Sequence, residues 1–201
     1  MVANPRSSLR KVLGLYEYEL NAWLEQALPK VTRLLDVGAN DGYFTFGCAA
    51  AFERLRIAAE IVCFEPQAVH AAELRRAIDA RVPSGVHIQL VEALVGDRLG
   101  DGRTTLDALA CEGRRKTLVK IDVEGAEIDV LRGAGSWIGP SNVFVIEVHQ
   151  RHYLDLIRRI FADRGAPVVQ VDQRPLPLLG RGARDAENWW LVSDLRRVPL
   201  T

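Results

Sequence analysis

Residues 34–44, with the sequence LLDVGANDGYF, combine ionisable side chains with a backbone that turns sharply. Asp36 and Asp41 flank a turn that contains Gly38 and Gly42, at the point where a predicted strand meets a predicted helix. Glycine has no side chain, so such a turn can bring the main chain close to a ligand. Two carboxylates would repel a pyrophosphate. The turn therefore predicts a site for a cationic or zwitterionic ligand.

Polar side chains also follow three later strands of the predicted sheet. Glu65 comes after the second strand, Asp122 and Glu124 after the fourth, and Glu147 and His149 at the end of the fifth. Ligands of open parallel sheets bind at the carboxyl ends of the strands. A hydrophobic core has no need of acids at these places, so this edge of the sheet is the predicted site.

The position of Glu65 indicates which ligand the turn binds. It lies 23 residues after Gly42, about where related folds place an acid that holds ribose hydroxyls. A ribose combined with a positive centre suggests S-adenosylmethionine. A nucleotide-cofactor enzyme such as a short dehydrogenase is a rival, but the G-x-G-x-x-G pattern that it needs is missing. A generic tight turn followed by an unrelated acid is the remaining alternative.

The acids and the histidine after strands four and five indicate how an acceptor would be activated. If the acceptor of the methyl group that S-adenosylmethionine carries is a hydroxyl, it must lose its proton around the time that it attacks the methyl carbon. His149, with an ordinary pKa of ~6.5, is suited to be the general base, with Asp122 orienting the hydroxyl. A carboxylate whose pKa is raised by acidic neighbours is an alternative base. The other interpretation is that His149 only hydrogen-bonds Glu147 or backbone.

The same cluster could hold a divalent metal ion, because carboxylates and an imidazole ligate Mg²⁺ or Mn²⁺. A divalent metal is therefore possible at this cluster but is not predicted.

Apolar runs of strand length alternate with helical patterns along the chain. Strands are expected over 31–37, 60–64, 86–91, 118–121, 143–146, 168–171 and 189–192. Helical segments are expected over 43–55, 66–82, 104–110, 126–133 and 153–164. This alternation predicts a mostly parallel sheet with helices on both faces.

The N-terminal segment is predicted to be an amphipathic helix, because Leu9, Leu13 and Leu20 recur with helical spacing before Pro29. We expect residues 1–30 to carry this helix and residues 31–201 to form one cofactor-binding domain. The helix could serve a homodimer, which the sequence leaves open. The segment 173–187 is expected to be either a lid or a plain loop.

Composition excludes some partners. Lys+Arg and Asp+Glu both number 26 in 201 residues, so no nucleic-acid partner is expected. No apolar stretch is long enough for a membrane span. Cys48, Cys63 and Cys111 are widely spaced and form no C-x-x-C pattern. Cys48 and Cys63 stand in apolar surroundings and are expected to be buried free thiols, which fits a cytoplasmic protein.

Several segments resemble FkbM-type methyltransferases, a class I S-adenosylmethionine-dependent family. The motifs LLDVGANDGYF, CFEP, TTLDAL, VKIDVEGAEIDVLRGA and VFVIEVH occur in the family's order within about residues 32–149. The resemblance implies a Rossmann-like seven-stranded sheet of order 3-2-1-4-5-7-6, with strand seven antiparallel. It also implies methyl transfer from S-adenosylmethionine, usually to a hydroxyl oxygen.

The resemblance also implies roles for individual residues. The cofactor's methionine portion would be lined by the turn residues Asp36, Gly38, Ala39, Asn40 and Gly42, and its ribose would be held by Glu65. Asp122 and Glu124 would face the transferred methyl group or the acceptor.

The predicted function is O-methylation of a small-molecule or sugar-containing acceptor. Sugar, polyketide, lipid headgroup and peptide acceptors all remain open. The alternative is a non-catalytic cofactor-binding or scaffold protein that keeps the fold. The acids at the strand ends count against it, because a scaffold does not need them.

Overall fold

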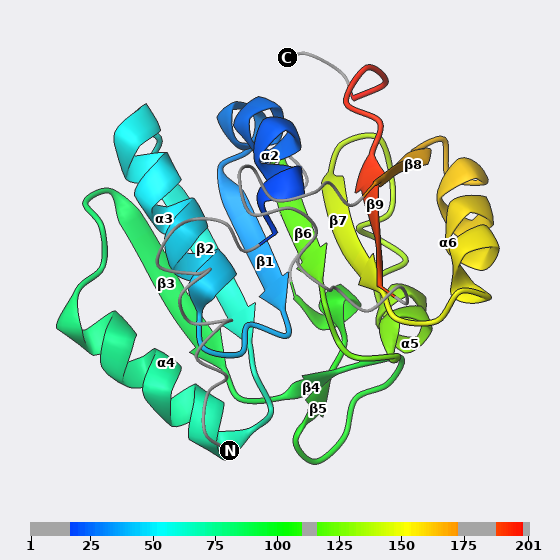
Figure 1. Ribbon diagram of the computed structural model, residues 1–201. Coiled ribbons are helices and arrows are strands. Elements are labelled where there is room, and N and C mark those ends of the chain that lie inside the picture. The colour runs from blue at the N-terminus through cyan, green and yellow to red at the C-terminus, as the bar shows by residue number, and fades with distance from the viewer. Residues whose placement is uncertain (1–16, 110–115, 173–187, 199–201) are drawn as a thin grey trace, which may run out of the picture.

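The computed structural model describes residues 17–109, 116–172 and 188–198. Within them, seven strands form one sheet in the order β3-β2-β1-β6-β7-β9-β8 (Figure 1). The strands are β1 Arg33–Val37, β2 Ala59–Phe64, β3 Val86–Val91, β6 Thr117–Ile121, β7 Val143–Val148, β8 Val168–Val171 and β9 Trp189–Ser193. Numbered along the chain, this is the order 3-2-1-4-5-7-6, and only the last strand is antiparallel to its neighbours. The predicted fold class is confirmed.

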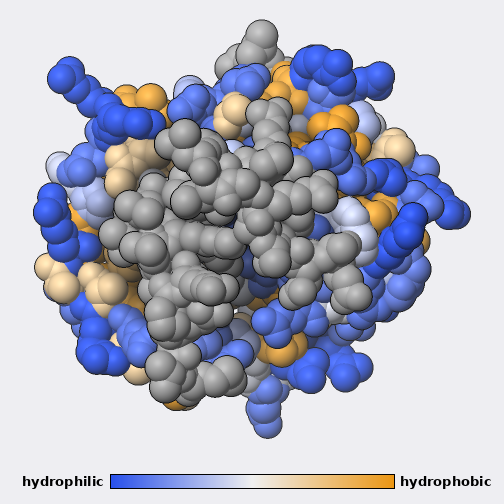
Figure 2. Space-filling model, viewed as in Figure 1, coloured by the Kyte–Doolittle hydropathy of each residue, from blue (hydrophilic) through white to orange (hydrophobic). Residues whose placement is uncertain are grey.

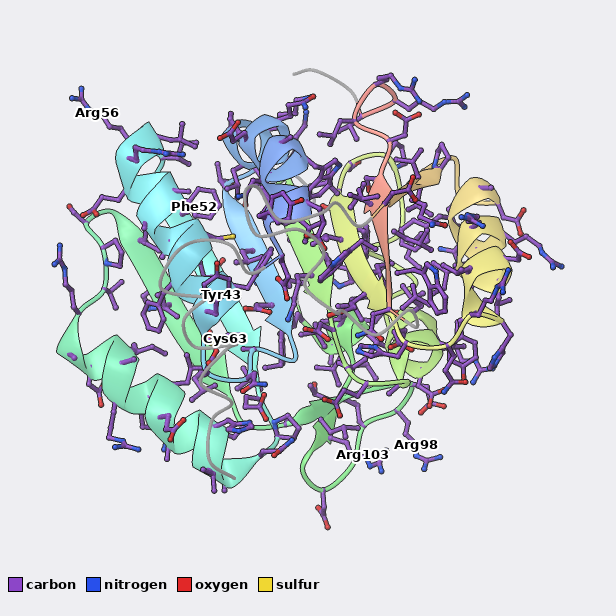
Figure 3. The ribbon with its side chains drawn as sticks, in the orientation of Figure 1. Tyr43, Phe52, Arg56, Cys63, Arg98 and Arg103 are labelled. Carbon is purple, nitrogen blue, oxygen red and sulfur yellow. The ribbon has the colours of Figure 1, made fainter. Side chains whose placement is uncertain are left out.

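Helices cover both faces of the sheet. One face carries α3 (Tyr43–Leu55), α4 (Ala68–Ala80) and α2 (Asn21–Ala27), which lies between the 3₁₀ turns Tyr18–Leu20 and Leu28–Lys30. The other face carries α5 (Glu127–Arg132), α6 (Tyr153–Ala162) and the 3₁₀ turn Leu106–Ala108. In Figure 3, Phe52 points from α3 toward the sheet, whereas Arg56 extends away from the end of that helix.

Alternation along the strands decides which side chain faces which helix layer. In β1, Leu34 packs in the core under α3, whereas Leu35 packs in the core under α5 and α6. Successive side chains of a strand point to opposite faces, so Asp36 follows Leu34 onto the α3 face. The register pairs Asp36 of β1 with Lys120 of β6, which brings two charged residues together within the sheet.

The N-terminal helix differs from its prediction. Within the described residues, Glu17 adopts a left-handed backbone with φ 53° and precedes a 3₁₀ turn. A continuous α-helix cannot pass through that conformation, so α2 begins only at Asn21. This segment packs on the sheet, because Leu20 and Leu28 are buried in the α3-side core. Residues 1–16 lie outside the described part.

The second predicted helix also differs from the sequence-based prediction. The second helix begins at Ala68 rather than Pro66, because Gln67 keeps an extended backbone. The Glu65 carboxylate accepts the Gln67 N–H at 2.9 Å, which holds the chain out of the helix at this point.

Two short strands, β4 (Leu94–Val95) and β5 (Arg103–Thr104), form a separate parallel pair that the sequence did not indicate. They lie near the carboxyl ends of the main strands (Figure 1). Arg98 and Arg103 extend outward from this unit (Figure 3).

Several other expectations concern the whole chain. Cys48 and Cys63 are buried free thiols, as predicted, whereas Cys111 and the 173–187 segment lie outside the described residues. None of the described helices is both long and apolar enough to cross a membrane. Hydrophilic side chains prevail around the rim of the face shown in Figure 2.

Candidate active site

Asp36 is not at the surface of the site but inside the sheet, with no solvent-exposed area. Its Oδ2 accepts the hydroxyl of Thr45 at 2.6 Å, and its Oδ1 lies 3.3 Å from the Lys120 ammonium. The cause is its position within β1 rather than after it. The structure therefore places Asp36 beneath the turn that was expected to bind the cofactor.

Lys120 connects the first turn to the strand-end acids. Its buried ammonium donates to the Gly38 carbonyl at 2.8 Å and lies 3.2 Å from Asp122 Oδ2. Burial alone would lower the pKa of Lys120, but the carboxylates of Asp36 and Asp122 outweigh it and raise the pKa above its usual range. A permanent cation thus holds both carboxylates and the turn in one arrangement.

We expect Lys120→Met to lower the free energy of unfolding by about 3–5 kcal/mol, because it leaves the buried Asp36 carboxylate without its cation. Chemical denaturation measures the loss. The matched double variant Lys120→Met/Asp36→Asn removes the orphaned charge and should recover part of the stability. Equal losses in the single and double variants would contradict the ion-pair explanation.

Position 38 must be glycine because the backbone of a neighbouring strand end, and not a ligand, lies against it. Its φ is +80°, and a Cβ built on it would lie 1.9 Å from the carbonyl oxygen of Asp122. The turn after β1 therefore packs directly against the end of β6. This close approach brings the first turn and Asp122 to the same side of one cavity.

A cavity of about 390 Å³ opens at the carboxyl ends of the strands. This volume lies in the range of small-molecule sites, roughly 300–1,000 Å³. Its lining includes seven polar residues of the candidate site: Asn40, Glu65, Asp122, Glu124, Glu147, His149 and Asn188. Gly38 also lines it, whereas Ala39 and Gly42 are buried turn residues outside the lining. The cavity joins the predicted cofactor half and acceptor half of the site.

Glu65 is held rigidly at the wall of this cavity. It is only 4% exposed, and its two oxygens accept the backbone N–H groups of Asn40 at 2.8 Å and Gln67 at 2.9 Å. A carboxylate has further lone pairs beyond these two bonds. Glu65 can therefore accept hydroxyl donors from a ligand while the turn keeps it in place.

His149 lies on the opposite side of the cavity, after β7. Its Nδ1 is 2.6 Å from Oε1 of Glu127, and its Nε2 is 3.7 Å from Oδ1 of Asp122. The hydrogen bond to Glu127 raises the pKa of His149 above its ordinary value. Burial opposes this rise, and the charges of Glu147 and Asp122 add to it. The partner of His149 is thus Glu127, and not Glu147 or backbone.

Glu147 is the third ionisable group of this cluster. It is 5% exposed, and the Asn188 side-chain amide donates to its Oε1 at 3.0 Å. Burial, followed by the charge of Asp122, raises the pKa of Glu147 to about 8. Ligand atoms of Asp122, Glu147 and His149 lie within 4.8 Å of one another, close enough to share a cation.

The raised pKa of Glu147 predicts a pH dependence of stability. Its carboxyl ionises near pH ~4.3 in the unfolded chain, so the folded protein binds more protons above that pH and stability falls as the pH rises toward about 8. We expect Glu147→Gln, which keeps an acceptor for Asn188, to flatten this decline. Thermal unfolding from about pH 5 to 9 measures it. Parallel curves for the two proteins would contradict the assignment.

Three residues of the site were missed by the sequence reasoning. Lys120 and Glu127 stood within the quoted VKIDVEGAEIDVLRGA motif, but no role was given to them. A lysine inside a central apolar strand and an acid on the buried side of a short helix were usable signals. Asn188, which follows the 173–187 segment, carried no such signal.

A comparison with protein families matches residues 102–167 to the Methyltransferase FkbM domain. The match covers about a third of the chain and contains Asp122, Glu127, Glu147 and His149. The first turn and Glu65 lie outside it. No curated protein sequence matches the chain.

Solved methyltransferase structures share the fold. The FkbM methyltransferase from Methylobacillus flagellatus KT has a TM-score of 0.60 at 20% identity, over 82% of this chain and 44% of that one. An rRNA methylase from Streptococcus thermophilus gives 0.57 at 8%, over 87% and 95% of the two chains. The magnesium protoporphyrin IX methyltransferase of Synechocystis PCC 6803, solved with bound S-adenosylmethionine, gives 0.54 at 14%, over 88% and 76%.

These findings agree on the fold. The present chain spans less than half the length of the Methylobacillus structure, whereas its described strands reproduce the sheet expected for such proteins. Residues 102–167 match the FkbM methyltransferase domain, and the described sheet has the fold of the solved methyltransferases.

Proposed function

We propose that the protein transfers the methyl group of S-adenosylmethionine to a hydroxyl oxygen of a small-molecule or sugar-containing acceptor. The observation that carries this proposal is the single cavity that joins Glu65, held by the first turn, to Asp122 and His149. One end offers oxygen atoms that can accept hydrogen bonds from ribose hydroxyls. The other end offers groups that can orient and deprotonate the substrate that receives the methyl group.

The residues present fit S-adenosylmethionine. Carboxylates line the cavity at Glu65, Asp122 and Glu124, and its described lining contains no lysine or arginine. Such a wall favours a ligand with cationic sulfonium and amino groups. When bound, S-adenosylmethionine supplies an activated methyl group.

On the cofactor side, Glu65 would hold the ribose, and Gly38 and Asn40 would lie along the methionine portion. Asp36 would act indirectly, because it is buried and positions the turn through Lys120. Ala39 and Gly42 would shape the turn without forming the cavity wall.

On the acceptor side, His149 would remove the hydroxyl proton through Nε2. Asp122 would orient the hydroxyl, because one of its oxygens faces His149 while the other lies beside Lys120. Glu124 lies exposed at the cavity wall, in a left-handed backbone conformation with φ 45°. We place it against the acceptor. Holding the two reactants in line would supply much of the rate enhancement.

Titration calorimetry with S-adenosylmethionine and S-adenosylhomocysteine tests the cofactor assignment. We expect micromolar binding to the wild type and about 10- to 100-fold weaker binding to Glu65→Gln. The reason is that a hydrogen bond to a charged group contributes about 1.5–3 kcal/mol. Gln has nearly the same shape as Glu but loses the negative charge.

Glu73→Gln, at an exposed position of α4, is the matched control and should bind as the wild type does. Thermal unfolding of both variants separates a lost ligand contact from a disturbed turn, because Glu65 also binds two backbone N–H groups. Absence of binding at millimolar ligand, with and without candidate acceptors, would overturn the proposal and favour a scaffold protein.

A further inference from the structure

Glu127 is a buried acid whose position the methyl-transfer scheme does not yet explain. It is the first residue of α5 and has no exposed area. Its Oε1 accepts the backbone N–H of Gly125 at 2.9 Å and faces Nδ1 of His149 at 2.6 Å. Its Oε2 has no hydrogen-bond partner in the described part of the chain. A buried carboxylate is costly unless it is paired, so its contact with His149 needs a reason.

The contact between Glu127 and His149 determines which nitrogen of the imidazole carries the proton. Burial alone would raise the pKa of Glu127, but the hydrogen bonds from His149 and Gly125 hold it below its ordinary value, so Glu127 is ionised. An ionised carboxylate only accepts hydrogen bonds. The proton of a neutral His149 is therefore on Nδ1, and Nε2 keeps its lone pair on the side of Asp122 and the cavity.

Three acids face His149 from three different elements. Glu127 reaches it from α5, Asp122 from the end of β6 and Glu147 from β7. The ammonium of Lys120 lies 3.2 Å from Asp122 and offsets part of that acid's charge. Glu127 alone bonds Nδ1, whereas the other two lie with the cavity-facing groups. The roles are thus separated by geometry.

We propose that Glu127 is the positioning residue for proton transfer, because it holds His149 as the Nδ1–H tautomer and presents Nε2 to the acceptor hydroxyl. This inference rests on the proposed function for the identity of the reaction. The acceptor O–H proton passes to Nε2 as the oxygen forms its bond to the methyl carbon. The bond from that carbon to sulfur breaks, and its electron pair stays on sulfur. The imidazolium keeps its Nδ1 proton, hydrogen-bonded to Glu127, and later releases the other proton to water.

The tautomer can be measured without any substrate. In ¹⁵N-histidine-labelled wild type above the titration midpoint of His149, we expect Nδ1 to show a protonated-type shift and Nε2 a lone-pair shift. The chain has four histidines, so the signals are assigned with His149→Gln. A wild-type His149 that carries its proton on Nε2 would overturn the inference by itself.

The variant Glu127→Gln then tests the cause. Its amide can donate or accept, so we expect a mixture of tautomers and a lower titration midpoint for His149. Asp129→Asn, an exposed acid of the same helix, is the matched control and should change neither. An unchanged tautomer and midpoint in folded Glu127→Gln would also overturn the inference.

Kinetics complete the test. We expect kcat of Glu127→Gln to fall about 10- to 100-fold and the acidic limb of its pH profile to move to lower pH, with partial rescue by Glu127→Asp. An unchanged profile in a variant with mixed tautomers would reject the positioning role while leaving the methyltransferase proposal intact. Failure of the wild type to bind S-adenosylmethionine would reject the proposed reaction and, with it, this role in proton transfer.

Discussion

Replacing His149 by alanine is expected to lower kcat for methyl transfer by about 10²–10⁴-fold, the usual contribution of a general base. Binding of S-adenosylmethionine should stay nearly unchanged, because His149 lies on the side of the cavity proposed for the acceptor, opposite Glu65. The fall in kcat is expected because Nε2 of His149 is directed toward the cavity, where it can accept a proton, while Nδ1 is bound to Glu127. Single-turnover rates on an acceptor found by screening hydroxylated compounds measure the chemical step.

His152→Ala is the matched control, because His152 is exposed three residues further along the chain. Its rate should equal that of the wild type. Assays with and without EDTA separate a base from a metal ligand, since Asp122, Glu147 and His149 are close enough to share a cation. Near-normal turnover in His149→Ala would refute the base assignment. Loss of wild-type activity in EDTA, restored by Mn²⁺, would make His149 a ligand instead.

Replacing Gly38 by alanine is expected to lower the free energy of unfolding by about 3 kcal/mol or more. The added Cβ would lie 1.9 Å from the Asp122 carbonyl oxygen, which is backbone and cannot rotate away. The positive φ adds about 1–2 kcal/mol for a residue with a side chain, and overpacking typically adds about 1–3 kcal/mol. Chemical denaturation measures the loss.

The affinity for S-adenosylmethionine should fall as well. The turn must move to relieve the contact, and this movement disturbs either the hydrogen bond from the turn to Glu65 or the hydrogen bond from Lys120 to the Gly38 carbonyl. Gly47→Ala is the matched control. It lies in α3, nothing lies within 4 Å of its added Cβ, and alanine should stabilise the helix by about 0.5–1 kcal/mol. Wild-type stability in Gly38→Ala would show that the ends of β1 and β6 are not locked together.

The sequence predicted the fold almost completely. Apolar strands that alternate with helical patterns left few arrangements, and α3 and β3 begin and end where the patterns predicted. The misses came from short-range contacts that override local preference. Gln67 stays extended because the Glu65 side chain binds its N–H, so α4 starts two residues after Pro66. The two-residue strands β4 and β5 are too short to show any periodicity.

The candidate site was predicted in part. Acids after parallel strands must meet at one edge of the sheet, and for this reason Glu65, Asp122, Glu147 and His149 line one cavity. The sequence could not show which strand-end acid is exposed to the cavity. Asp36 was expected there, but it lies one residue inside β1 and points under α3.

The sequence by itself determined the order of the elements and the edge at which the site forms, because these depend on local patterns and on the rules of parallel sheets. Only the tertiary structure decided which side chains and carbonyl groups contact one another in the site. Glu127 reaches His149 across 22 positions of the chain, and Lys120 reaches the Gly38 carbonyl across 82. Such contacts depend on the crossing of β6 beside β1 and on the placement of α5 beneath the end of β7. Spacing along the chain does not carry that three-dimensional information.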